Sequence, residues 1–162
     1  VLSLIDKYYE GKIPNPENTN DNDNEILNEV ISQKNDIESN LNQFKFREAL
    51  KSLMKIARIG NKFLADTEPW KIKNENPERV EQILKTSFEI VSYLAVLSEP
   101  FLPYTSKKLK KMIGLNKSDW SNLDNLGREI NFNFTIINKE MLFRRIEDSE
   151  IEFQISKLKN DI

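Results

Sequence analysis

Trp70 and the cationic side chains that precede it are the residues whose types and spacing best suit nucleic-acid binding. Trp70 follows Pro69 directly after a long segment with helical periodicity, and an indole offers a broad face on which an unpaired base can stack. Five cations of that segment fall within an arc of about 80° when each residue is advanced by about 100°: Arg47, Lys51, Lys55, Arg58 and Lys62. Such an arc can follow a phosphate backbone, and it leads toward the tryptophan.

Each of these residues also has a purely structural interpretation, and the pattern alone leaves both open. A tryptophan after a proline can anchor a helix end to the core, and lysines on an outer helix face can serve solubility alone. Asn61, at the border between the cationic arc and the apolar stripe, can present a donor and an acceptor to a base edge, or can link helices instead. A second cluster is explained by the dipole of the helix that it ends and is left out of the predicted site: Lys107, Lys108, Lys110 and Lys111.

The composition excludes most kinds of enzymatic site. The 162 residues contain no cysteine and no histidine, which removes cysteine-bound zinc and the usual general base. No glycine-rich phosphate loop occurs, and the acidic loop at residues 15–24 lacks the spacing of a calcium loop. We therefore predict no catalytic residue, no metal and no cofactor in this sequence. The formal net charge is −2, so nucleic-acid binding has to rest on a local basic patch.

The elements that must position these residues are predicted to be helices. Residues 45–66 form one amphipathic helix that ends before Pro69, since a proline disfavours helical geometry in the residue before it. Asp21 or Asp23 is expected to cap the preceding helix, which ends near residue 42, and Asn76 to cap the following one. Further helices are expected at residues 1–10, 105–113 and 149–160, with a turn starting at residues 118–120 and an extended segment at 130–137.

Short connections between these helices predict an all-α protein, an antiparallel bundle of about five helices. Residues 1–128 form the bundle, and residues 129–162 add the extended segment and a C-terminal helix that packs on it. The apolar stripe of the helix at residues 45–66 is expected to comprise Phe46, Ala49, Leu50, Leu53, Ala57, Gly60 and Leu64. The core is expected to include Leu50, Leu53, Leu84, Phe88, Val91 and Leu94. No apolar run approaches the roughly 18 residues that a membrane span needs, so no membrane partner is predicted.

Several motifs of this sequence resemble the anticodon-binding domain of methionyl-tRNA synthetases, which are class I aminoacyl-tRNA synthetases. They are Phe46-Arg47-Glu48-Ala49-Leu50, Gly60-Asn61-Lys62-Phe63-Leu64, Glu68-Pro69-Trp70, Asn76-Pro77-Glu78-Arg79, residues 98–103 (SEPFLP), Leu142-Phe143 and Ile146-Glu147-Asp148. In that family the tryptophan matching Trp70 stacks on an anticodon base, and the helix that carries Asn61 lines the site. The resemblance therefore implies an RNA-binding site at Trp70, Asn61, Pro69, Lys62, Arg58 and Lys55.

The resemblance further implies a cytoplasmic enzyme that attaches methionine to its tRNA. The partners are then the anticodon loop and the enzyme's own catalytic domain, which uses ATP; zinc in that domain is left open, as is the oligomeric state. The family's other anticodon signature, an asparagine followed four residues later by an arginine, is expected just upstream of Val1. Asn133, Phe134 and Lys139 stand where the family usually has glycine-histidine and a later proline. Two alternatives remain: a synthetase for leucine, isoleucine or valine, and a helical protein-interaction module without an RNA role.

Overall fold

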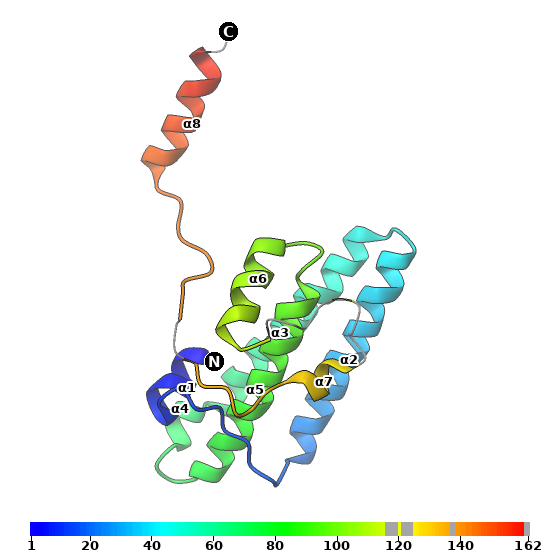
Figure 1. Cartoon of the computed structure of the whole chain (residues 1–162), viewed down its shortest axis with the longest axis vertical. Helices are drawn as coiled ribbons and strands as arrows, with labels where there is room; N and C mark the ends of the chain where they lie inside the picture. The colour runs from blue at the N-terminus through cyan, green and yellow to red at the C-terminus, as the bar shows by residue number, and fades with distance from the viewer. Residues whose placement is uncertain (116–119, 121–124, 137–138, 161–162) are drawn as a thin grey trace.

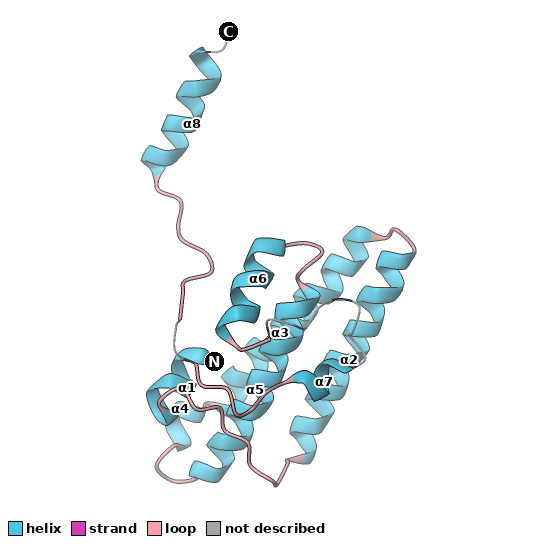
Figure 2. Cartoon of the chain, viewed as in Figure 1, coloured by secondary structure: helices cyan, strands magenta, loops and turns pink. Residues whose placement is uncertain are grey.

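The structure, a computed structural model, describes residues 1–115, 120, 125–136 and 139–160. The helices are α1 (Leu2–Tyr9), α2 (Asp21–Asn42), α3 (Phe46–Thr67), α4 (Pro69–Ile72), α5 (Pro77–Leu97), α6 (Pro103–Met112), α7 (Leu126–Glu129) and α8 (Asp148–Asn160). Within the described residues there is no β-strand, as Figure 2 shows. The all-α prediction is therefore confirmed. Residues 116–119 and 121–124 lie outside the described part, and with them most of the turn expected at residues 118–120.

Helix α5 is the centre of the bundle because it is apolar on nearly every side. Twelve of its residues are buried, among them Leu84 and Phe88, neither of which has any exposed surface. Helices α1, α2, α3, α4 and α6 all contact it, and Figure 1 shows them grouped around it. Asn76 caps its first turn, where its side chain accepts a hydrogen bond from the backbone N–H of Arg79 at 3.1 Å, and Pro77 takes the first helical position. Both features were predicted.

Helix α3 has the predicted period and end, but its buried face differs from the predicted one. Phe46 and Leu50 are 59% and 42% exposed, so their prediction as buried residues is wrong. The buried residues are Ala49, Leu53, Ile56, Ile59 and Phe63, whose face is rotated by about 70° from the predicted stripe. Apolar residues occupy more than half of the circumference of this helix, so its sequence does not fix which part of that apolar surface is buried. Contacts with α2 and α5 select the edge that carries Ile56 and Phe63.

Of the other predicted core residues, Leu53, Leu84 and Phe88 are buried. Val91 and Leu94 are partly buried and pack against the core. Gly60, placed in the same predicted stripe, lies where α3 approaches α5 closely, because a β-carbon there would stand 3.1 Å from a methyl group of Ile90.

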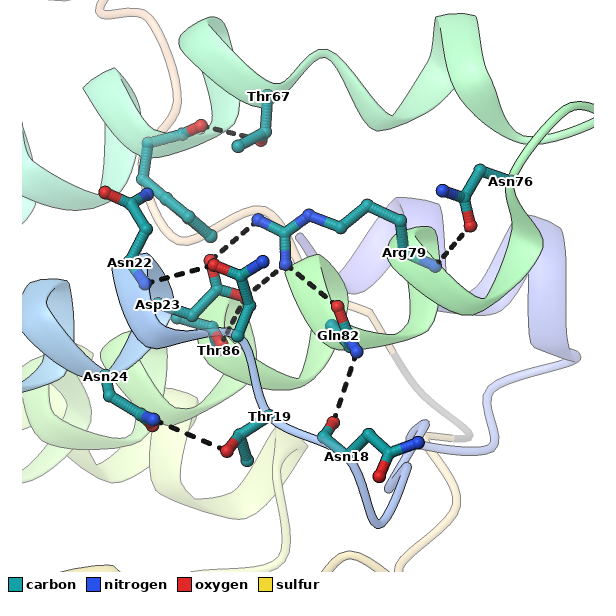
Figure 3. A network of polar contacts seen from close by, with 12 residues as sticks. Asn18, Thr19, Asn22, Asp23, Asn24, Thr67, Asn76, Arg79, Gln82 and Thr86 are labelled. Atoms are coloured by element: carbon teal, nitrogen blue, oxygen red, sulfur yellow. Dashed lines mark hydrogen bonds and ion pairs between the residues drawn. The ribbon is translucent and has the colours of Figure 1, made fainter.

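The start of α2 corrects another prediction. Asn20, and not Asp21 or Asp23, is the N-cap, and its side chain accepts a hydrogen bond from the backbone N–H of Asn22 at 3.0 Å. Asp23 is turned inward instead, where Arg79 of α5 donates to both of its carboxylate oxygens at 2.6 and 2.7 Å. Figure 3 shows this bidentate pair, with Gln82 accepting a further hydrogen bond from the guanidinium. The pair joins α2 to α5 across 56 residues of sequence.

Helix α6 begins two residues earlier than expected, at Pro103. A proline is well placed at the first helical position because its missing N–H would have no partner there. The hydroxyl of Ser106 donates to the backbone oxygen of Ala95 at 2.7 Å, which fixes α6 against the end of α5.

Residues 130–136 lie on the bundle, as predicted, but they are not extended throughout, because the backbone N–H of Phe134 donates to the oxygen of Asn131 at 3.1 Å and closes a turn. The ring of Phe132 is 6.2 Å from that of Phe88, and Ile130 and Ile136 are buried. The backbone N–H of Ile136 donates to the oxygen of Gly11 at 2.9 Å, beside an isolated antiparallel bridge between Lys12 and Thr135. Gly11 has a φ of 80°, and a side chain there would collide with the main-chain oxygen of Ile136.

The C-terminal helix was predicted to pack on the bundle, and this is not seen. Helix α8 forms as expected, but it stands away from the bundle at the end of an extended segment (Figure 1). Its Ile151, Phe153 and Ile155 are between 47% and 60% exposed. Helical period predicts the element correctly because the period is local, whereas docking depends on a complementary surface that the sequence pattern does not reveal.

Candidate nucleic-acid interface

The corner between α3 and α4 positions Trp70. The chain reverses direction at Glu68, which adopts a left-handed conformation with a φ of 40° and serves as both the C-cap of α3 and the N-cap of α4. Pro69 then starts α4 and is buried. Because Pro69 points into the protein, the next side chain in this single helical turn points outward, and Trp70 is 48% exposed. The indole is therefore neither a core residue nor a free side chain, since about half of its surface is held by the protein.

Lys73 and Tyr8 bring α1 to this corner. Lys73 follows Trp70 by three residues, so the two side chains leave the chain on the same side. The ammonium of Lys73 lies 4.0 Å from the centre of the Tyr8 ring, in cation–π contact with α1. Tyr8 lies in the helix that was expected at residues 1–10. No local spacing could have placed it here, because the contact spans 65 residues of sequence.

Asn61, Arg58 and Lys62 are exposed on the last half of α3. Asn61 was expected at the border of the buried stripe, but the rotation of the buried face leaves it within the solvent-exposed surface. It lies about 9 Å of helix rise before Thr67, the last residue of α3. Neither Arg58 nor Lys62 forms an ion pair with any described residue, so the two cations of the arc that lie nearest to the Trp70 corner have no acidic partner there.

Two of the three remaining cations of the arc, Lys51 and Lys55, are paired with carboxylates, whereas Arg47 forms no ion pair with any described residue. Lys51 contacts Glu48 at 2.8 Å, and this hydrogen bond lowers the pKa of Glu48 below its ordinary value. Lys55 lies 3.3 Å from Glu29 of α2, which turns it toward that helix. Beyond Trp70, Lys71 contacts Glu68 at 2.8 Å. Of the predicted site residues, the structure leaves Trp70, Asn61, Arg58 and Lys62 exposed, whereas Pro69 is buried and Lys55 is paired.

The described residues offer little other chemistry. No group of three or more carboxylates among them could hold a metal ion. Within the same part of the chain, no helix is both long enough and apolar enough to cross a membrane.

This fold occurs in solved synthetase structures. The free-state methionyl-tRNA synthetase of Mycobacterium tuberculosis superposes with a TM-score of 0.82 at 20% identity, over 90% of this chain and 30% of that protein. The same enzyme in complex with methionyl-adenylate gives a TM-score of 0.78 at 19% identity, over 89% of this chain and 29% of that one. The fold is thus that of a helical domain found within aminoacyl-tRNA synthetases.

The family described as the anticodon binding domain of methionyl tRNA ligase matches residues 13–159, and the chain belongs to it. The methionine–tRNA ligase of Bacteroides fragilis (strain YCH46) is 44% identical over 163 residues, which cover 98% of this chain and 23% of that protein. The ligase of Flavobacterium psychrophilum is 42% identical over 159 residues, with the same two shares. The chain therefore spans about a quarter of the length of these relatives. The family and these relatives are both described by the methionine enzyme, and not by a synthetase for leucine, isoleucine or valine.

Proposed function

We propose that this chain binds the anticodon loop of the methionine tRNA, as part of a longer enzyme that joins methionine to that tRNA with ATP. The family membership supports the partner, and one observation supports the place: Trp70 is half exposed while Pro69 beside it is buried. A tryptophan that only anchored a helix end would be covered. A stacking platform has to be accessible on one face and fixed on the other.

In this proposal, an anticodon base leaves the loop and stacks on Trp70. Stacking of one base on an aromatic side chain contributes about 1–3 kcal/mol. Asn61 contacts a base edge through its amide, which has both a donor and an acceptor. Arg58 and Lys62 contact phosphates, since no described carboxylate neutralises them. Methionine activation takes place in another part of the longer enzyme, so the chain alone should not catalyse methionine-dependent pyrophosphate exchange.

The test compares RNA binding by the chain and by its Trp70→Ala variant. The probe is a fluorescently labelled hairpin whose loop carries the CAU anticodon, and a hairpin with a changed anticodon measures specificity. Loss of stacking should raise the Kd for the CAU hairpin about 5- to 150-fold. Lys62→Ala should instead mainly lower the slope of log K against log salt, by about 0.7–1.

Phe46→Ala is the matched control. Phe46 is a similarly exposed aromatic residue at the other end of α3, about 33 Å of helix rise from the Trp70 corner. It should leave the Kd unchanged. If Trp70→Ala is folded and binds the CAU hairpin as tightly as Phe46→Ala does, the stacking role is wrong. If the unsubstituted chain does not distinguish the two hairpins, the anticodon-reading role is wrong. If it is folded and binds neither hairpin, the protein-interaction alternative is favoured.

A further inference from the structure

Helix α6 carries a stripe of three lysines behind an exposed tyrosine. Tyr104, Lys107, Lys108 and Lys111 are spaced so that they fall within an arc of about 100° on the outer side of the helix. All four are exposed, and Tyr104 is the most exposed large hydrophobic residue of the described part of the chain, at 84%. We call these four residues the α6 stripe.

The charges of the α6 stripe differ from those of its neighbour Lys110. Lys110 points inward, is 8% exposed and contacts Glu99 at 3.0 Å. Lys107, Lys108 and Lys111 form no ion pair with any described residue. Three uncompensated positive charges therefore lie side by side on a chain whose formal net charge is −2.

The dipole of α6 does not account for the α6 stripe. A helix dipole favours cations within its last turn, and α6 ends at Met112. Lys111 lies in that turn, but Lys107 and Lys108 precede it. Beside the stripe, Glu99, Pro103, Tyr104, Lys107, Lys110 and Lys111 line a surface groove of about 530 Å³. The stripe is thus a cationic ridge bordered by a hollow and headed by an aromatic ring, a combination that suits a polyanion with planar groups.

The position of α6 relates the stripe to Trp70. Helix α4 lies at the start of α5, and α6 runs back from the end of α5 toward its middle, as Figure 1 shows. Helix α5 rises about 31 Å and α6 about 15 Å, so along the axis of α5 the stripe begins roughly 16 Å from the α4 end and continues away from it. Lys111 is the nearest member and Tyr104 the farthest. A rod-like ligand held at the α4 end reaches the stripe only if it extends well beyond a loop.

We propose that the α6 stripe binds the phosphate backbone of the base-paired stem that continues from the anticodon loop. This inference rests on the proposed function and extends it from the loop to the stem. Phosphates repeat along a stem as the lysines repeat along the helix, so three contacts can form together without reading any base. The stripe therefore adds affinity for tRNA of any sequence, while the Trp70 corner distinguishes anticodons.

The experiment uses two labelled hairpins that share the same CAU loop. One has a short stem of about four base pairs. The other has the complete stem of a tRNA anticodon arm, lengthened by further base pairs. The variant is Lys107→Gln/Lys108→Gln/Lys111→Gln. The control is Lys12→Gln/Lys45→Gln/Lys157→Gln, which removes three exposed lysines from three other parts of the chain and gives the same net charge. The Kd of each variant for each hairpin is measured at several salt concentrations.

The stripe variant should bind the long hairpin more weakly than the control does, and its slope of log K against log salt should be smaller by about 2–3. Between about 50 and 200 mM salt, three lost contacts correspond to about 40-fold less salt weakening. Both variants should bind the short hairpin equally, which also shows that the stripe variant is folded. Equal binding of the long hairpin by both variants would overturn the proposal. An acidic protein surface would then be the better candidate partner for the α6 stripe. Trp70→Ala tests the proposed function separately, because it should weaken both hairpins by the same factor.

Discussion

Two ion pairs of this molecule join similar charges at similar distances but differ in burial. Arg79 and Asp23 meet at 2.6 Å at the junction of α2 and α5, where the Asp23 side chain is 3% exposed. Lys51 and Glu48 meet at 2.8 Å on the outer face of α3, where both side chains are at least half exposed. The first pair links distant parts of the chain and is closed to any ligand. The second spans one helical turn, and water or a phosphate can replace either partner.

The difference shows how the molecule separates stability from binding. Charges that hold the fold are buried and paired bidentately, with polar neighbours such as Gln82 and Thr86. Charges offered to a ligand lie on the outer faces of α3 and α6, where their removal should leave the bundle intact. Four experiments with substituted chains can break or sharpen this comparison.

Arg79→Met should have the largest effect on stability. It leaves the Asp23 carboxylate buried and without its cation, which costs about 3–5 kcal/mol. The double variant Asp23→Leu/Arg79→Met removes both charges and should recover most of the loss. Urea unfolding of the three proteins measures this. A double variant that is no more stable than Arg79→Met would mean that the polar network itself, and not the unpaired charge, decides the stability.

Leu53→Ala and Leu50→Ala compare the two faces of α3 without any charge. Leu53 is 4% exposed, so its truncation leaves a cavity and should cost about 2–5 kcal/mol. Leu50 is 42% exposed, and its truncation should cost well under half as much. Unfolding midpoints in urea distinguish the two. Equal losses would show that the outer face of α3 is covered in solution.

Glu89→Gln examines a partly buried carboxylate that has no arginine partner among the described residues. Burial raises the pKa of Glu89 above its ordinary value of 4.5, while the charge of Lys85 partly opposes this effect. The fold therefore favours the protonated form, and the stability that this provides is present below about pH 4.5 and is lost as the pH rises through the folded-state pKa. Relative to the unsubstituted chain, the variant should become more stable between pH 4.5 and pH 7. A difference in unfolding free energy that stays constant with pH would contradict this.

Lys51→Ala should have the smallest effect. The pair with Glu48 is exposed, and such pairs contribute between 0 and about 1 kcal/mol. The loss should shrink further in high salt because salt screens exposed charges. A loss above about 2 kcal/mol in thermal unfolding would show that the outer face of α3 carries structural charges after all.

The sequence predicts those features of the molecule that depend on neighbouring residues. The end of α3 before Pro69 and the Asn76 cap are both present, because proline geometry and capping act within a few residues. The exposed face of α3 was misplaced, since apolar residues such as Phe46 and Leu50 continue beyond the edge that α2 and α5 cover. Asp23 was expected to cap a helix because its partner, Arg79, lies 56 residues away.

The same distinction applies to the candidate site. The pattern around Pro69 left open whether Trp70 anchors a helix end to the core or offers an accessible ring, and the structure shows a side chain that is 48% exposed. The pairing of Lys55 with Glu29 was not predicted, because it depends on how α2 lies against α3. The α6 lysines were set aside since the helix dipole explains a terminal cluster. The structure shows that Lys110 turns inward toward Glu99, whereas Lys107, Lys108 and Lys111 face outward together.

The contact between Gly11 and Ile136 has a consequence for the order in which the chain folds. It closes a loop of about 125 residues, whereas helices α2 to α6 follow one another through connections of one to five residues. Contacts between distant residues form slowly because they must wait until the intervening chain is compact. We therefore expect the helices to assemble first and residues 130–136 to settle on them last, covering Phe88 only at the final step. During synthesis, the bundle would keep one open side until this late segment has emerged.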